Sequence, residues 1–218
     1  MKVDIWSDVR CPFCYIGKRK FENALSQFEH KDKIEVEWHS YELDPQAKTE
    51  PTKNAHEHLA EIKGQTKEWA IEMGRYVSET AAEAGITFDL DKQVVANSFN
   101  AHRLIQLAKS LGLADEAEES LFIAHFSEGK NIDDKQTLVE IGISIGIDED
   151  VVARMLENNT FTDEVRYDQS AAKSIGITGV PFFIINQKYT ISGAQPPATF
   201  LEALKMSWLE YAAQEESF

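Results

Sequence analysis

The side chains with the clearest chemical potential in this 218-residue chain are its two cysteines, Cys11 and Cys14, in the segment CPFC. Thiols at this spacing can form a reversible disulfide, bind a metal ion or stay inert. Two cysteines cannot build a disulfide framework. Zinc is disfavoured because there is no second CxxC and because His56 and His58 are only two positions apart. We therefore expect a redox-active pair and no metal.

The segments around the cysteines predict a strand, a helix and a second strand. Residues 2–6 (KVDIW) alternate apolar and polar side chains and are typical of a short strand. From residue 15 to 28, apolar side chains recur every three or four positions, which indicates a helix. Residues 33–43 alternate again and predict the second strand. The cysteines then lie where the first strand passes into the helix.

That position assigns different roles to the two thiols. With Pro12 as the first helical residue, Cys11 lies at the helix cap and Cys14 one turn inside. The unpaired N–H groups and positive end of the helix favour the thiolate of Cys11, which is the form that attacks disulfides. Cys14 is better placed to resolve a mixed disulfide.

The rest of the chain divides into a helical middle and a mixed end. Successive helical patterns fill residues 52–175, after a proline-containing loop at 43–54, and show no fixed repeat. The patterns include residues 68–85, 94–112, 117–129, 137–146 and 151–159. Two strands follow at 180–186 and 188–194, and a helix begins near Pro197. We predict an α/β domain of residues 1–44 and 176–218, interrupted by a helical insertion of residues 45–175.

Composition excludes several classes of partner. The formal net charge is −15, and only Lys18–Lys20 group basic residues near the cysteines, so nucleic acid is not expected. The acidic run EAEES at 116–120 is typical of a solvated helix face. The sequence shows no signal peptide and no long apolar segment. We expect a cytoplasmic protein without a membrane partner.

Several segments along the sequence resemble those of a known family. CPFC after the first strand and TGVPFF before the third strand resemble the thioredoxin superfamily, in particular its DsbA-like branch with an inserted helical domain. SDVRCPFCYIGK, NSFNAHRL, GITGVPFFIIN and ISGAQP are similar to the FrnE-like group of non-exported thiol-disulfide oxidoreductases. The resemblance implies a thioredoxin fold, β-α-β then β-β-α, around a helical insertion.

The resemblance also implies a substrate site. The proline matching Pro181 is cis in that family and faces the disulfide, and Val180 supplies backbone groups that pair with a substrate chain. We expect Pro12 and Phe13 to border the same site, with Tyr15 and Phe182 as further members of an apolar patch. Protein or small-molecule thiols and disulfides are the expected partners. No cofactor is expected beyond the cysteine pair, with glutathione as a potential co-substrate.

Two further expectations concern ionisable residues: the acidic residues near the thiols and His102. Thioredoxins and DsbA carry an acidic residue six positions before the attacking cysteine, but here that position is Ile5. Asp4 and Asp8 lie near it, yet we do not expect either to serve as a buried proton acceptor. His102, in the NSFNAHRL motif, is assigned as a candidate residue of the substrate cleft, with helix packing as the alternative.

Three classes of function follow. The first is a thiol-disulfide oxidoreductase in which Cys11 attacks and Cys14 resolves. The second is a glutathione-dependent isomerase or transferase resembling 2-hydroxychromene-2-carboxylate isomerase or kappa-class glutathione transferases; serine usually replaces the first cysteine in those relatives. The third is a binding module without enzymatic activity. The intact CxxC favours the first. The direction of the reaction and the oligomeric state are left open.

Overall fold

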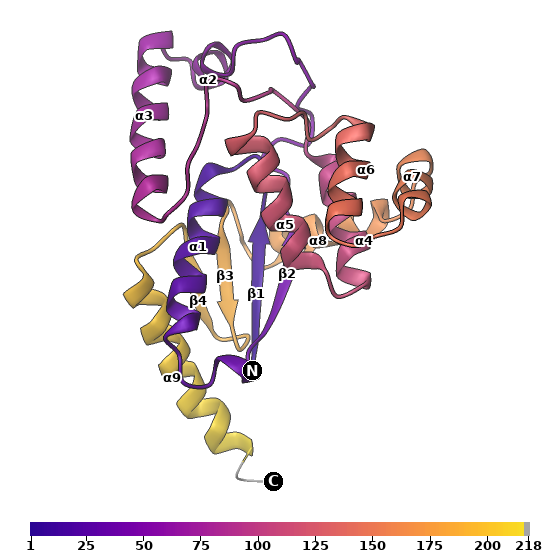
Figure 1. Ribbon diagram of the computed structural model, residues 1–218. Helices are drawn as coiled ribbons and strands as arrows, with labels where there is room; N and C mark the ends of the chain where they lie inside the picture. Colours follow the sequence, from indigo (N-terminus) through magenta and orange to yellow (C-terminus); the bar gives the residue numbers. More distant parts are fainter. Residues whose placement is uncertain (216–218) are drawn as a thin grey trace.

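The computed structural model describes residues 1–215 (Figure 1). Its elements, in chain order, are β1 (Lys2–Ser7), α1 (Pro12–Ser26), a short 3-10 turn (Lys31–Lys33), β2 (Glu35–Ser40), α2 (Ala55–Lys63), α3 (Lys67–Glu83), α4 (Phe99–Ser110), α5 (Ala114–Phe122), a π-helical turn (Ile123–Ser127), α6 (Lys135–Ser144), α7 (Glu149–Glu157), α8 (Thr162–Ser174), β3 (Phe182–Ile185), β4 (Tyr189–Ser192) and α9 (Pro197–Glu215). The predicted order of a β-α-β unit, helices and a β-β-α unit is confirmed.

The sheet has the strand order β2-β1-β3-β4. β1 and β2 are parallel and need the crossover helix α1 between them, whereas β3 pairs antiparallel with both β1 and β4. The turn joining β3 and β4 places Asn186 and Gln187 at positive φ, which suits a tight hairpin. The first and last segments of the chain therefore share one sheet.

Helices cover both faces of this sheet. α1 and α9 pack on one face, where the rings of Phe183 and Phe200 meet edge-to-face with centroids 4.7 Å apart. On the other face, Trp6 of β1 packs with Ala172 of α8 and with Ile177. The sheet is therefore buried between two layers, and its apolar strands lie in the core.

The helices from α2 to α8 form the insertion between β2 and β3 (Figure 1). Its core is continuous with the first turns of α1, including the two cysteines, so the thiols lie where the two parts meet. One boundary was wrong: the helix expected from residue 94 begins at Phe99. Val95 instead forms an isolated bridge with Glu50, whose N–H donates to the Val95 carbonyl at 2.8 Å.

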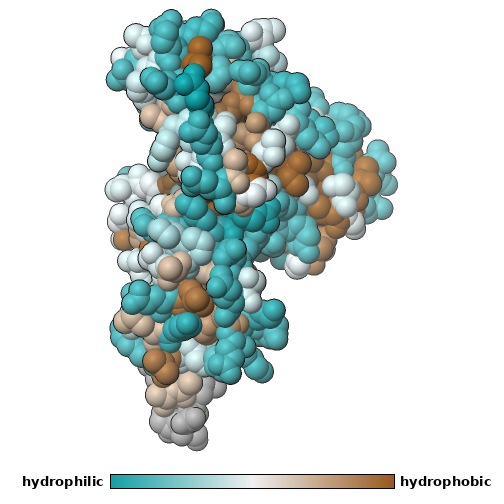
Figure 2. All heavy atoms as spheres, turned by 60° about the vertical axis from the view of Figure 1, so that its left-hand side comes forward, coloured by the Kyte–Doolittle hydropathy of each residue, from teal (hydrophilic) through white to brown (hydrophobic). Residues whose placement is uncertain are grey.

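The face of the molecule shown in Figure 2 is largely polar. Small apolar areas interrupt it. Among residues 1–215, no helix combines the length and apolarity needed to cross a membrane.

Candidate active site

The CPFC segment begins α1 as predicted. Cys11 is the N-cap residue, with extended backbone angles, and Pro12 occupies the first turn. The Cys11 N–H donates to the Asp8 carbonyl at 2.9 Å, and the Cys14 N–H donates to the Cys11 carbonyl at 3.0 Å. No acidic side chain lies in the first turn of α1, so the positive end of the helix is not neutralised there. Both cysteines are free thiols.

The loop before β3 lies against this helix end. The Val180–Pro181 peptide bond is cis, and the Cys11 Sγ lies 3.6 Å from the Val180 carbonyl oxygen. Pro181 also packs on α1, because a Cβ added to Gly17 would lie only 2.8 Å from the proline Cγ. Segments about 170 residues apart in the sequence therefore meet at one thiol.

The two thiols have different surroundings. Cys11 is 6% exposed and Cys14 is 1% exposed. Burial, together with the neighbouring Cys11, raises the pKa of the Cys14 thiol well above its usual range. The Asp8 N–H donates to the Cys14 Sγ at 3.5 Å. Cys14 is therefore a protonated, enclosed thiol at neutral pH.

Contrary to expectation, the Asp8 side chain is fully buried, and the backbone N–H of the same residue donates to the Cys14 sulfur. The carboxylate accepts hydrogen bonds from the N–H groups of Arg10 and Leu43, at 3.0 and 2.8 Å, and lies 3.5 Å from the His102 Nε2. Burial raises the pKa of the Asp8 carboxyl, but His102 and these N–H groups outweigh burial and hold it below its usual range. A buried acid is thus present, although not at the position of Ile5.

The assignment of His102 to the substrate cleft was also wrong. Its side chain is 0% exposed and points to Asp8 from α4, so it cannot contact a substrate in this structure. The other motif residues have structural roles. Asn97 precedes α4 and accepts the Phe99 N–H at 2.7 Å, and the Arg103 guanidinium donates to backbone carbonyls between residues 155 and 160. The motif joins the insertion to the site.

The aromatic residues expected in an apolar patch separate into two groups. Phe13 and Phe182 are partly buried, Phe13 against the insertion core and Phe182 on the α8 side of the sheet. Tyr15 is 3% exposed, and its ring stacks on Phe122 with centroids 4.9 Å apart. Tyr15 therefore belongs to the core and not to an exposed patch.

A pocket with a volume of about 180 Å³ opens beside Pro12 and is lined mainly by apolar side chains of α2, α3 and the segment before α4. Arg10 also lines it, and the Arg10 guanidinium forms no ion pair with the acidic residues of the described chain. Burial lowers the pKa of His125, at the pocket wall, to about 3, so this imidazole is neutral. The pocket can accept an apolar group next to Pro12.

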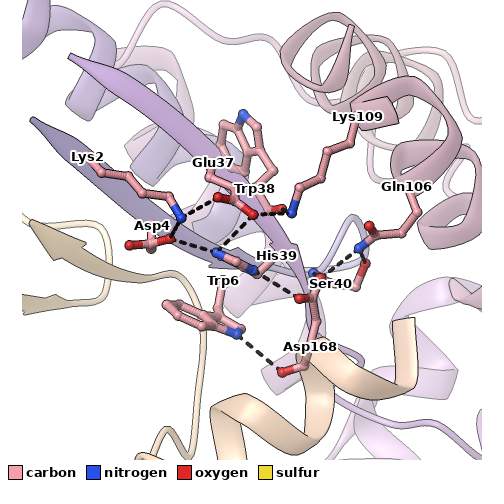
Figure 3. Close-up of polar contacts among 10 residues, drawn as sticks. All are labelled: Lys2, Asp4, Trp6, Glu37, Trp38, His39, Ser40, Gln106, Lys109 and Asp168. Atoms are coloured by element: carbon pink, nitrogen blue, oxygen red, sulfur yellow. Dashed lines mark hydrogen bonds and ion pairs between the residues drawn. The ribbon is translucent and has the colours of Figure 1, made fainter. Parts of the chain in front are cut away.

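A second polar cluster lies at the edge of the sheet (Figure 3). Ligand atoms of Asp4, Glu37 and His39 lie within 4.8 Å of one another, a spacing that a metal ion could bridge. However, the Lys2 amine binds both carboxylates, and Lys109 also pairs with Glu37 at 2.5 Å. Because these cations already neutralise the carboxylates, we interpret the cluster as an ion-pair network.

The fold and the position of the cysteines and the cis proline define a thioredoxin-like protein with a helical insertion. The model of the DsbA-like thioredoxin domain family matches residues 2–205, and the chain belongs to that family. A crystal structure of a probable DsbA oxidoreductase from Streptomyces coelicolor is 35% identical to this chain. The two structures superpose with a TM-score of 0.91, and the match covers 96% of this chain and 91% of the Streptomyces chain.

Two more distant structures share the fold alone. A 2-hydroxychromene-2-carboxylate isomerase is 15% identical, with a TM-score of 0.69 over 100% of this chain and 98% of that one. The cytosolic disulfide reductase DsbM from Pseudomonas aeruginosa is 14% identical, with a TM-score of 0.64 over 100% of both chains. Both comparisons therefore support the fold of this chain.

Sequence reasoning missed Glu118. The acidic run at 116–120 was expected on a solvated face, but the Glu118 side chain is 1% exposed. A signal was available, because Glu118 lies three and four positions before the buried Leu121 and Phe122 of α5 and so shares their helix face. The density of acidic residues concealed that periodicity.

Proposed function

We propose that this protein is a thiol-disulfide oxidoreductase in which the Cys11 thiolate attacks a substrate disulfide and Cys14 resolves the mixed disulfide. The observation that carries the proposal is the environment of Cys11: a free thiol at a helix N-terminus whose first turn holds no acidic residue, 3.6 Å from the carbonyl oxygen that precedes Pro181. Membership of the DsbA-like family supports the same chemistry.

The roles of the flanking residues follow from the same arrangement. We propose that the Val180 backbone and Pro181 hold the substrate chain beside Cys11, with Pro12 and Phe13 bordering it. The apolar pocket next to Pro12 favours substrates that carry an apolar group near the disulfide. Proteins or small-molecule disulfides are the proposed partners, in the cytoplasm. A neighbouring structure of DsbM is a complex with GSH, which makes glutathione a reasonable co-substrate to test.

The proposal predicts opposite effects of the two cysteine substitutions. Cys14→Ser should trap Cys11 as a stable mixed disulfide with substrate, because the resolving thiol is absent. Cys11→Ser should abolish insulin reduction and the refolding of a scrambled disulfide substrate. Mass spectrometry of the trapped species identifies the bonded cysteine, and the Cys11→Ser Cys14→Ser variant is the matched control. Full activity in Cys11→Ser, or a stable mixed disulfide on Cys14 in Cys11→Ser, would contradict the assignment.

The second candidate is a glutathione-dependent isomerase, favoured by the pocket beside Pro12 and by the shared fold. A serine in place of Cys11 would suffice for that chemistry. The Cys11→Ser variant therefore separates the two candidates. If the first candidate is correct, this variant has no glutathione-dependent isomerisation of 2-hydroxychromene-2-carboxylate, whereas such activity in the variant would favour the second candidate. The direction of the redox reaction follows from the potential of the cysteine pair, since about −270 mV indicates a reductase and about −120 mV an oxidant.

A further inference from the structure

The pocket beside Pro12 differs in charge from the rest of this acidic protein. Of the residues described, no aspartate or glutamate lines it, although the chain carries 37 acidic residues and a formal net charge of −15. Arg10 and Pro12, the two sequence neighbours of Cys11, both line the pocket. Because consecutive Cα atoms are about 3.8 Å apart, a molecule in the pocket lies beside the backbone that carries the Cys11 thiol.

The pocket has room for one ring or one branched aliphatic group. Its volume is about 180 Å³, and an apolar cavity of about 150 Å³ is enough to bind benzene. The side chains of Val77, Leu90 and Phe126 supply part of its apolar lining. Ile62 of α2 also lines the pocket and is 57% exposed, so an apolar surface continues from the pocket to the exterior. The pocket therefore suits the apolar part of a small organic molecule.

The Arg10 guanidinium supplies the pocket with a positive charge. It forms no ion pair with the acidic residues of the described chain. Its charge acts within the pocket, because burial lowers the pKa of His58, and Lys53 and Arg10 lower it further against the opposing effects of Glu50 and Glu61. A planar guanidinium can bind both oxygens of a carboxylate, and such a bond is strengthened where apolar walls exclude water. The unpaired guanidinium therefore favours an anion at this pocket.

The buried wall of the pocket adds a neutral N–H group. His125 lines the pocket and is 2% exposed, and burial and the charge of Arg10 lower its pKa to about 3 against the opposing effect of Asp8. The side-chain amide nitrogen of Gln93 lies 2.8 Å from the His125 Nε2. An amide nitrogen only donates, so Nε2 accepts and the ring proton lies on Nδ1, which has no hydrogen-bond partner in the described chain. The unpaired groups of Arg10 and His125 are thus donors, which select oxygen acceptors in a ligand.

The other charged groups around the pocket have partners. The His56 Nε2 lies 3.1 Å from the Asp91 carboxylate. Glu50 lies 3.9 Å from the His58 Nδ1 and 3.6 Å from the Lys53 amine. Within the residues described, the guanidinium is therefore the charge at this pocket that is left to bind a ligand, and its sign is opposite to that of the protein as a whole.

We propose that this pocket selects small disulfides whose organic part joins one aromatic or branched aliphatic group to a carboxylate, with the apolar group in the pocket and the carboxylate on Arg10. The inference rests on the proposed function and names a substrate class for it. Arg10 is the residue that determines this specificity, and Cys11 remains the attacking group.

The reaction of such a substrate balances. The Cys11 thiolate attacks one sulfur, the substrate S–S bond breaks, and one half of the substrate leaves as a thiolate. Cys14 then attacks the Cys11 sulfur, the Cys11–Cys14 disulfide forms, and the second half leaves as a thiolate while the Cys14 proton passes to water. The cysteine pair is oxidised by two electrons, and the substrate disulfide is reduced to two thiolates.

Four disulfides separate the contributions of the ring and of the charge. 3,3′-Dithiodibenzoate has both, 3,3′-dithiodibenzamide has the ring alone, 3,3′-dithiodipropionate has the carboxylate alone, and 3,3′-dithiodipropionamide has neither. In a Cys14→Ser background, the mixed disulfide on Cys11 accumulates, so acid quenching and mass spectrometry give its rate of formation. Each rate is divided by the rate of the same disulfide with dithiothreitol, which removes differences in intrinsic reactivity.

The protein should react at least about tenfold faster with the dibenzoate than with the dibenzamide, as expected for a charge-assisted bidentate bond. The dipropionate should show a smaller preference over its amide, because no ring holds that carboxylate at the pocket. Arg10→Gln should remove the preference for the dibenzoate and leave the rate with the dibenzamide unchanged. Arg10→Lys should keep part of the preference, because it retains the charge without the bidentate geometry.

Arg75→Gln is the matched control. Arg75 is an exposed residue of α3 that does not line the pocket, so its removal changes the net charge by the same amount. This variant should keep the preference for the dibenzoate. Equal rates with the dibenzoate and the dibenzamide before any change at Arg10, or an equal loss with all four disulfides in Arg10→Gln, would overturn the proposal. The second result would mean that Arg10 acts on the thiolate of Cys11 and not on the substrate.

A binding measurement tests the pocket without the thiols. In the Cys11→Ser Cys14→Ser variant, 3-(methylthio)benzoate should shift the ring signals of His58 and His125 in NMR spectra. It should also raise the pKa of His58, because the carboxylate offsets the charge of Arg10. The neutral 3-(methylthio)benzamide should bind more weakly, and Arg10→Gln in the same background should abolish the difference.

The two measurements distinguish failure of the substrate class from failure of the proposed function. If no disulfide reacts at Cys11 but the benzoate binds through Arg10, the proposed function fails and the pocket keeps its ligand class. If the disulfides react at Cys11 but neither their rates nor the binding of the benzoate depend on Arg10, the function stands and the substrate class is wrong.

Discussion

At the residue scale, neighbouring glutamates on α5 have opposite environments. Glu118 is enclosed, and burial raises its pKa to about 7. For Glu119, burial also raises the pKa, but Lys18, Tyr15 and Arg19 outweigh it and hold the pKa below its usual value. A carboxyl with a raised pKa weakens the fold once it ionises, whereas one with a lowered pKa strengthens the fold when ionised.

This contrast predicts stability changes of opposite sign. Glu118→Gln should match the wild type below about pH 4.5, become more stable than it as pH rises from there to about 7, and keep that gain at higher pH. The gain has an upper bound of about 3.5 kcal/mol, because each pKa unit corresponds to about 1.4 kcal/mol. Glu119→Gln is the control and should lose about 1 kcal/mol at pH 8. Urea unfolding at several pH values measures both, and a loss in Glu118→Gln at pH 8 would indicate a structural role.

At the scale of elements, the site depends on the contact between α1 and the loop before β3. Gly17 lies one turn after Cys14, and the absence of a side chain there lets Pro181 approach the helix. A methyl group at Gly17 would meet the proline Cγ at 2.8 Å, which is closer than two carbon atoms approach in practice. The loop and the helix cannot both keep their positions with a larger residue.

Gly17→Ala should therefore destabilise the protein by about 1–2 kcal/mol, in spite of the better helix propensity of alanine. Displacement of Pro181 from Cys11 should also slow the reaction of Cys11 with a disulfide reagent several-fold. Gly179→Ala is the matched control, because a Cβ at Gly179 meets nothing within 4 Å. Thermal melts and stopped-flow rates report the two effects. Equal stabilities and equal reaction rates of the two variants would show that the contact between Gly17 and Pro181 does not position the proline.

At the scale of the whole molecule, His39 joins the sheet to the insertion (Figure 3). Its ring lies between Asp4 of β1, at 2.9 Å, and Asp168 of α8, at 3.0 Å. Asp168 also accepts the Ser40 N–H and the Gln106 amide, and the Trp6 indole donates to its carbonyl. Burial lowers the pKa of His39, but the two aspartates outweigh burial and raise it above its usual value.

Because the folded state binds this proton more tightly than the unfolded state, the stabilisation is complete below about pH 6.5 and is lost as pH rises through the folded pKa. His39→Gln should cost about 2 kcal/mol at pH 6 and clearly less at pH 9. His30→Gln is the control, since His30 stacks on Trp208 and forms no ion pair with the residues described. Denaturant unfolding at both pH values checks the difference. A cost that is independent of pH would mean that His39 is neutral in the folded protein.

The sequence alone determined the parts of this protein that depend on local pattern. Alternating residues predicted β1 and β2, and Pro12 predicted the start of α1. These signals lie within a few residues of each other or repeat with a fixed period, so they need no knowledge of distant contacts. The thioredoxin fold was implied by the resemblance of the CxxC and the later Val-Pro pair to a known family.

Tertiary structure alone decided how Asp8, His102 and Glu118 lie beneath Cys14. They are separated by 94 and 16 positions in the sequence, and no periodicity relates one to the next. Their burial depends on how α4 and α5 pack against the loop after β1, and a charged side chain by itself predicts exposure. The sequence therefore identified the thiols, whereas only the packing of the insertion on the thioredoxin-like sheet determined which ionisable groups surround them.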